Sequence, residues 1–293
     1  MAYGRNTKEL LERIADATTE LDVSELDITS LPPLPPGLRG LWCYKTKIRS
    51  LPPLPAGLQI LDCNDTRLTS LPPLPDGLQL VWCFNTPLTS LPPLPPGLLK
   101  LYCNVTRLTS LPTLPDGLRE LYCSHTPLTS LPTLPPGLQK LWCHTTSLTT
   151  LPKLPDTLWE IYCFNTPLTS LPTLPARLGR LWCHTTQITC IPELPATLQE
   201  LSCWNTPLTT LPPLPAGLEQ LSCADTPLLL QRIKGESIKD YNLRWDEWRS
   251  KKRILDRTKN LKEEIIASTW HPDRFERWCL DEEEKKENDT MMG

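Results

Sequence analysis

The chain repeats one phrase every twenty residues between Leu31 and Thr226, and the period never shifts by a residue. The phrase is Leu-Pro-x-Leu-Pro-x-x-Leu-x-x-Leu-x-Cys-x-x-Thr-x-Leu, with Ile or Val in place of Leu in some copies. One copy is too short to bury its own apolar side chains, so each copy must pack against the copies before and after it. The period therefore predicts a solenoid.

The repeats divide the chain into three predicted parts. Residues 31–230 make ten copies of twenty residues, and Leu21, Val23 and Ile28 fit the second half of one more. We predict an N-terminal helical cap and half repeat over 1–30, ten repeats over 31–230, and a helical C-terminal cap or tail over 231–293. Caps are expected because the end strands of a solenoid expose unpaired edges and apolar side chains.

The N-terminal cap has the pattern of a helix over residues 6–20. Asn6 can cap that helix, and Glu9 lies three residues further on, as in a capping box. Four apolar residues then fall on one helical face, which we expect to cover the first repeat: Leu10, Ile14, Ala17 and Leu21.

Each copy combines a strand pattern with a proline pattern. The stretch Leu38-x-x-Leu41-x-Cys43-x-x-Thr46-x-Ile48 has the spacing of a leucine-rich repeat, which is typical of a short strand in a parallel sheet. Cys and Thr replace the usual Leu and Asn. A thiol is small enough to be buried, and a Thr hydroxyl can bond the backbone of the turn.

The first half of each copy cannot be helical. Each proline fixes φ and removes a hydrogen-bond donor, and the residue before it is pushed to extended values. Of the 34 prolines, 33 lie between residues 31 and 230. We therefore predict an α/β-type solenoid, a leucine-rich-repeat horseshoe with a parallel concave sheet, a convex side of polyproline II, and helical caps at both ends.

The repeat resembles those of two groups of proteins. The stretch Leu111-Pro-Thr-Leu-Pro-Asp-Gly-Leu-Arg-Glu-Leu121 is similar to the twenty-residue repeats of bacterial type III secreted effectors. The ending Cys-x-x-Thr-x-Leu-Thr-Ser is more similar to leucine-rich-repeat proteins of large DNA viruses of amoebae and algae. The tail stretches 269–275 and 278–281, Thr-Trp-His-Pro-Asp-Arg-Phe and Trp-Cys-Leu-Asp, also resemble a motif of such viral proteins. The resemblance implies a viral protein that is a virion component, or an effector in host cytoplasm.

Cysteine usage and charge restrict the setting of the protein. Ten of the twelve cysteines recur at every twentieth position from Cys43 to Cys223, where a disulfide framework makes no topological sense. A reducing compartment is expected, either host cytoplasm or a virion, and no signal peptide or membrane span is apparent. The formal net charge is only −3, so nucleic acid is not expected as a partner.

One column of the repeat is aromatic. The residue between the Leu and the Cys should point out of the concave face, and seven of these ten positions carry a ring: Trp42, Trp82, Tyr102, Tyr122, Trp142, Tyr162 and Trp182. The column after the Cys adds Tyr44, Phe84, Phe164 and Trp204, together with His144 and His184. Asp62, Ser202 and Ser222 fill the other positions of the first column.

Rings on a strand can stack across strands without any further role. However, each ring has an area of about 150–250 Å², so an open row would exceed the apolar patch of a usual monomer. We therefore predict a protein-binding face formed by Trp42, Trp82, Tyr102, Tyr122, Trp142, Tyr162, Trp182, Phe84, Phe164 and Trp204. No cofactor, metal site or catalytic residue is expected, and the sequence leaves the oligomeric state open.

A second column alternates in charge between adjacent copies. It contains Lys100, Glu120, Lys140, Glu160, Arg180 and Glu200. Opposite charges on neighbouring strands should pair and hold the strand register, with a small contribution from each exposed pair.

Two alternatives to a concave protein-binding face remain. The solenoid could be a rigid scaffold whose tail docks a partner through Trp245, Trp248, Trp270 and Trp278. A ubiquitin-ligase-like activity could use Cys279, because Cys279-Leu280-Asp281 matches the Cys-x-Asp motif of the effector ligases. Only 63 residues follow the repeats, and acidic neighbours of Cys279 do not activate a thiol. We therefore expect a non-enzymatic protein.

Overall fold

The computed structural model describes residues 5–209, 211–212 and 214–227 of the 293-residue chain. The predicted C-terminal cap or tail over 231–293 lies outside the described residues, as do its four tryptophans and Cys279.

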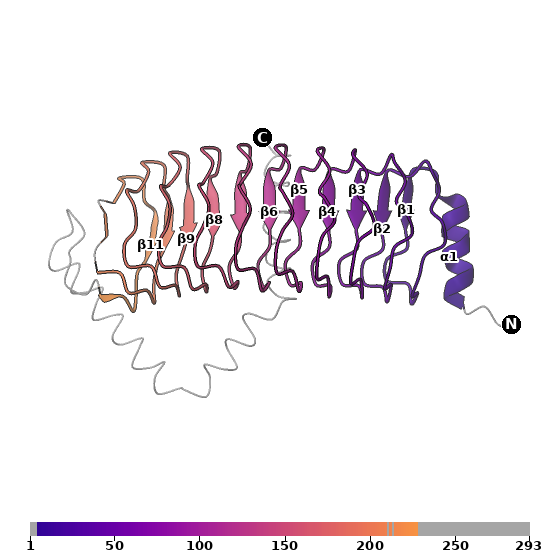
Figure 1. Ribbon diagram of the computed structural model, residues 1–293, viewed down its shortest axis with the longest axis horizontal. Coiled ribbons are helices and arrows are strands. Elements are labelled where there is room, and N and C mark those ends of the chain that lie inside the picture. Colours follow the sequence, from indigo (N-terminus) through magenta and orange to yellow (C-terminus); the bar gives the residue numbers. More distant parts are fainter. Residues whose placement is uncertain (1–4, 210, 213, 228–293) are drawn as a thin grey trace, which may run out of the picture. The chain divides into compact units, whose positions relative to one another are not determined.

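The described part of the chain forms one sheet of eleven parallel strands in chain order (Figure 1). The strands are β1 (Glu20–Asp22), β2 (Gly40–Trp42), β3 (Ile60–Asp62), β4 (Leu80–Trp82), β5 (Lys100–Tyr102), β6 (Glu120–Tyr122), β7 (Lys140–Trp142), β8 (Glu160–Tyr162), β9 (Arg180–Trp182), β10 (Glu200–Ser202) and β11 (Gln220–Ser222). Each strand pairs with the next at an offset of twenty residues, as Leu41 does with Leu61. The predicted parallel solenoid is confirmed.

The core consists of the columns that the sequence pattern assigns to it. In the copy around β2, the side chains of Leu38, Leu41, Cys43 and Ile48 are fully buried, and the equivalent positions of the copies up to Leu208 are buried as well. Leu31 is buried and Leu34 packs against the core, so both leucines of the proline segment face inward. The proline segment contains neither helix nor strand, and its polyproline II conformation stays a prediction.

A left-handed residue follows each strand. The second residue after the Cys has φ between 50° and 62° in every copy, from Glu25 to Asp225, although none of these residues is glycine. The next residue is the Thr of the phrase, whose hydroxyl donates to the carbonyl oxygen three residues earlier. Thr46 Oγ1, for example, lies 2.7 Å from Cys43 O. The predicted Thr-to-backbone bond is therefore confirmed, and it closes the turn.

The helix predicted over 6–20 is present as α1 (Arg5–Asp16) and ends earlier, because residues 20–22 form β1 instead. Leu10 belongs to the core, and Ile14 and Ala17 pack against it. Leu21 also belongs to the core, but from the strand and not from the helix.

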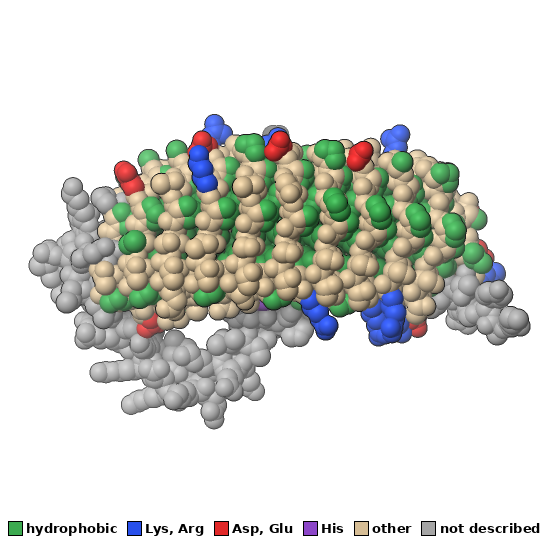
Figure 2. Space-filling view, in the orientation of Figure 1, with side chains coloured by type: hydrophobic (Ala, Val, Ile, Leu, Met, Phe, Trp, Pro, Cys, Tyr) green, Lys and Arg blue, Asp and Glu red, His purple; other side chains and the backbone are tan. Residues whose placement is uncertain are grey.

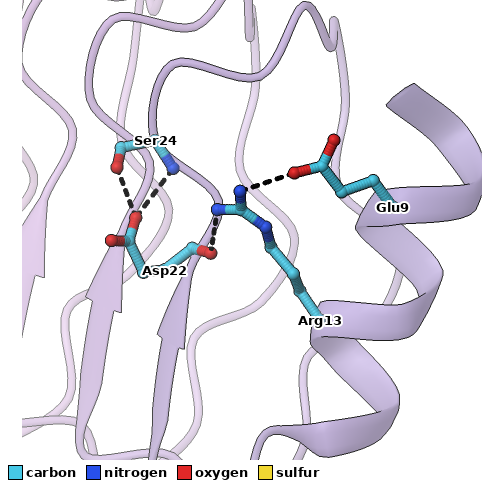
Figure 3. Close-up of polar contacts among 4 residues, drawn as sticks. All are labelled: Glu9, Arg13, Asp22 and Ser24. Carbon is cyan, nitrogen blue, oxygen red and sulfur yellow. Dashed lines mark hydrogen bonds and ion pairs between the residues drawn. The ribbon is translucent and has the colours of Figure 1, made fainter. Parts of the chain in front are cut away.

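Polar contacts join α1 to β1 (Figure 3). The guanidinium of Arg13 donates to the backbone oxygen of Asp22 at 2.9 Å and to Glu9 Oε1 at 2.6 Å. The Asp22 carboxylate accepts hydrogen bonds from the backbone N–H and the hydroxyl of Ser24. Arg13 therefore ties the helix to the first strand.

The repeat is visible on the surface of the described part of the chain. Figure 2 shows hydrophobic side chains in rows that run along the repeats, with most Lys, Arg, Asp and Glu side chains along the two long edges. Residues that occupy the same position in successive repeats thus lie in one row on the molecule.

Candidate functional site

Six consecutive strands place their last residue in one row of rings, which we call the aromatic row: Trp82, Tyr102, Tyr122, Trp142, Tyr162 and Trp182. Neighbouring ring centroids lie 4.3–6.0 Å apart. Most pairs are stacked, whereas Tyr122 meets Trp142 edge-on at 63°. The period and the parallel register produce this row, because successive copies superimpose equivalent positions.

The aromatic row is less open to water than its sequence suggests. Tyr122 is only 8% exposed and Tyr162 only 5%, because a ring lies against each of their two faces. Trp82, Tyr102, Trp142 and Trp182 are partly exposed. The expectation of six fully open rings therefore needs correction, since stacking consumes much of their area. The exposed area of the row therefore belongs mainly to its three tryptophans and to Tyr102.

A second column of rings lies beside the aromatic row. His144, Phe164, His184 and Trp204 stack with centroids 4.2–4.4 Å apart, and His125 meets His144 edge-on at 5.1 Å. Phe164 is only 3% exposed, so this predicted partner-binding residue lies within the stack. Phe164 also lies 6.3 Å from Trp182, which joins the two columns.

Burial disfavours the charged form of the histidines in the second column. Burial lowers the pKa of His184 to about 4. Burial, together with His125 and His184, also lowers the pKa of His144 well below its ordinary value. These imidazoles stack as flat rings, and Nδ1 of each lies 3.3 Å from the hydroxyl of the next threonine. The sequence did not reveal this role because other copies place varied residues there.

Two buried carboxylates support the aromatic row. Tyr102 donates its hydroxyl proton to Glu120 Oε2 at 2.8 Å, and the indole N–H of Trp142 donates to Glu160 Oε1. Glu120 lies 3.3 Å from Lys100 Nζ and 4.0 Å from Lys140 Nζ. The predicted alternation of charge thus forms ion pairs, and it also anchors rings of the row.

The same arrangement recurs around Arg180. Its guanidinium lies 3.5 Å from Glu160 and 3.2 Å from Glu200, and it faces the ring of Trp159 at 5.7 Å. Lys140 Nζ also lies over the Trp159 ring, 5.5 Å from its centroid. The link between the charged column and the rings was missed in the sequence, because it depends on side-chain direction and not on spacing.

Three predicted binding residues remain. Trp42 and Phe84 lie outside the two stacks of rings, and Trp204 is the last ring of the second column. Trp42 and Phe84 are partly exposed, as is Trp204 at the end of the second column. Asp62 separates Trp42 from Trp82 in the register of the sheet. The predicted residues thus form two groups with a break at β3.

The described residues contain no cluster of three or more His, Cys, Asp or Glu side chains that could hold a metal ion. The cysteines of the repeated column from Cys43 to Cys203 form no disulfide, and burial raises the pKa of Cys103 to about 12, so its thiol stays protonated. Within the same residues, no helix is long and apolar enough to cross a membrane.

Comparison with solved structures places this geometry among known folds. YopM from Yersinia enterocolitica superimposes with a TM-score of 0.70 at 33% identity, over 71% of this chain and 47% of that protein. The fold is that of the leucine-rich repeat. This leucine-rich-repeat chain therefore spans about half the length of that effector.

Two further structures share the leucine-rich-repeat fold. A Shigella effector leucine-rich-repeat domain gives a TM-score of 0.51 at 26% identity, over 58% of this chain and 81% of that one. The functional domain of InlJ from Listeria monocytogenes, described as including a cysteine ladder, gives a TM-score of 0.57 at 22% identity, over 71% of this chain and 54% of that one. The chain matches no protein-family model and no curated protein.

Proposed function

We propose that this leucine-rich-repeat chain is a non-enzymatic interaction or assembly module that binds another protein on its concave face. The observation that carries the proposal is the aromatic row, in which three tryptophans remain partly exposed on one side of the sheet. Tryptophan and tyrosine are enriched at the anchoring positions of protein interfaces. Stacking and the hydrogen bonds to Glu120 and Glu160 hold the rings in place, which lowers the entropy lost on binding.

The similar effectors support this proposal at the level of protein class. Two of the similar proteins, YopM and the protein of the Shigella domain, are bacterial effectors. We further propose that the chain acts in host cytoplasm or in a virion, because the buried cysteines from Cys43 to Cys203 form no disulfide and a reducing environment suits them. A viral origin and a role as virion component rest on the sequence resemblance and stay predictions.

The proposal is tested by removing the two exposed anchors of the row. Trp142→Ser and Trp182→Ser should abolish capture of the partner from the native setting, because Ser202 and Ser222 show that the column accepts serine. The matched control carries Thr113→Ser and Thr133→Ser, which change exposed side chains in the proline segment. The circular dichroism spectra of both variants at room temperature should show that they remain folded. Unchanged capture by the folded tryptophan variant would reject the proposal.

A further inference from the structure

Partly exposed and buried side chains alternate along the aromatic row from β5 to β9. The ring at the end of the strand is partly exposed in β5, β7 and β9 and buried in β6 and β8. The first residue of each strand alternates in the same way, as a partly exposed cation or a buried glutamate. The partly exposed rings are Tyr102, Trp142 and Trp182, and the cations are Lys100, Lys140 and Arg180. The surface therefore repeats every two strands, although the sequence repeats every strand.

The length of this two-strand unit restricts the ligand that can follow the row. The ring centroid of Tyr162 lies 4.9 Å from that of Trp142 and 4.4 Å from that of Trp182. The two tryptophans are therefore about 9 Å apart, in agreement with a strand spacing of about 4.8 Å. A polyproline II segment has three residues per turn and rises about 3.1 Å per residue, so it also repeats at about 9 Å. Every third residue of such a segment thus reaches the next exposed ring.

Other regular conformations of a bound peptide fit this spacing less well. One face of an α-helix returns after seven residues, or about 10.5 Å, so a helix would be about 3 Å out of step between Tyr102 and Trp182. A β-strand returns to the same face every two residues, at about 6.6 Å, which is not a divisor of the ring spacing. The period of the exposed rings therefore favours polyproline II.

The cations beside the exposed rings supply hydrogen-bond donors. Lys100 and Tyr102 are the first and third residues of β5, so their side chains leave the same face of the sheet, and β7 and β9 repeat this arrangement. The side chains of the three cations are 27–45% exposed although each pairs with a glutamate. An ammonium carries three donors and a guanidinium five, so donors remain beside every exposed ring.

The row offers donors on its surface and keeps its acceptors inside. Glu120 and Glu160 are only 9% and 3% exposed, and they already accept hydrogen bonds from Tyr102 and Trp142. A proline segment matches such a surface, because its residues lack a backbone N–H and its carbonyls form no internal hydrogen bonds. A linear polysaccharide matches it less well, since its hydroxyl groups also need acceptors beside the rings.

We propose that the protein partner contributes a proline-rich polyproline II segment that lies along the aromatic row, across β5 to β9. Every third residue of the segment packs its ring against Tyr102, Trp142 or Trp182, and carbonyl oxygens accept hydrogen bonds from the cations at the start of β5, β7 and β9. Segments of this kind dock on aromatic-lined surfaces because their preformed conformation loses little entropy on binding. This inference rests on the proposed protein-binding function and specifies the segment that is bound.

Proline peptides test the site on the full chain without the partner. Acetyl-heptaproline amide makes two turns and reaches three exposed rings, whereas acetyl-tetraproline amide makes one turn and reaches two. The indole N–H signals of Trp142 and Trp182 in NMR spectra report binding, and that of Trp42, outside the row, is the internal control. We expect heptaproline to shift the first two signals only, and to bind roughly tenfold tighter than tetraproline because a third ring takes part. A glycine–serine peptide of equal length should shift none of them.

The variant Trp182→Ser removes one of the three rings. It should weaken heptaproline binding roughly tenfold and abolish the difference between heptaproline and tetraproline, because two rings remain. Ser202 shows that the column accepts serine, and circular dichroism checks that the variant is folded. Leu11→Ser is the matched control, since it removes an exposed apolar side chain of α1 and should leave both affinities unchanged.

Three results would overturn the polyproline site: equal affinity for the two proline peptides, equal shifts with the glycine–serine peptide, or unchanged heptaproline binding in the folded Trp182→Ser chain. Chitohexaose that shifts the Trp142 and Trp182 signals where heptaproline does not would also overturn it, in favour of a carbohydrate-binding row. If partner capture depends on Trp142 and Trp182 but heptaproline does not bind, only the polyproline site is lost. If heptaproline binds but capture does not depend on these tryptophans, the proposed function fails and the polyproline site stands.

Discussion

Tyr102 and Glu120 lie on neighbouring strands, and the tyrosine hydroxyl donates a 2.8 Å hydrogen bond to the glutamate Oε2. The same glutamate pairs with Lys100 and Lys140, so one carboxylate connects the charged column to the aromatic row. The rings are therefore held by polar contacts as well as by stacking.

Tyr102→Phe should lower the free energy of unfolding by about 1 kcal/mol, because it removes this hydrogen bond and leaves the ring stack in place. Denaturant unfolding followed by circular dichroism measures the change. Tyr44→Phe is the control, since its hydroxyl forms no hydrogen bond within the part of the chain that the structure describes, and it should change stability by less than about 0.5 kcal/mol. Equal effects of the two substitutions would contradict the account of Glu120.

Val105→Asn should raise the free energy of unfolding. Val105 has a φ of 53°, a left-handed conformation that costs a non-glycine residue about 1–2 kcal/mol and suits asparagine better than a β-branched residue. Asn85, Asn165 and Asn205 fill the same position in other copies. The reverse change, Asn165→Val, should destabilise by a similar amount. Thermal melts should show a higher melting temperature for Val105→Asn and a lower one for Asn165→Val than for the parent chain. Shifts of both melting temperatures in the same direction would refute the explanation.

Acid should destabilise the protein through the histidines of the second column. Burial lowers the pKa of His184 to about 4, whereas an unfolded histidine titrates near 6.5. The unfolded state therefore binds more protons between these values, so stability falls as the pH drops from about 6.5 to about 4. His144→Phe with His184→Phe should flatten this part of the profile, because Phe84 and Phe164 show that the column accepts phenylalanine.

The test compares melting temperatures at pH 7 and pH 4.5 for the parent chain and the double phenylalanine variant. The pKa of Asp62 is raised, so Asp62 acts in the opposite direction, and its contribution to stability is greatest at low pH and is lost as the pH rises towards about 6. Because Asp62 is present in both proteins, the difference between them isolates the histidines. An identical pH dependence of the two proteins would contradict the role assigned to His144 and His184.

The period of the sequence predicts the strands, their register and the core, because equivalent residues of a solenoid share one environment. The buried column from Cys43 onward and the hydrogen bond from Thr46 to the Cys43 carbonyl both agree with that reading. The left-handed turn position was not predicted, since residues as different as Val105 and His125 occupy it. The effect of stacking on exposure was also missed, because it depends on ring orientation and not on spacing.

The most direct test of the concave binding face is photo-crosslinking from single positions in the full chain. A benzoylphenylalanine at Ser202 would lie in the first column beside Trp182, whereas one at Thr133 would lie in an exposed part of the proline segment. If the concave face binds the partner, irradiation in the native setting should give a protein adduct from position 202 and none from position 133. An adduct from position 133 alone would contradict the proposal.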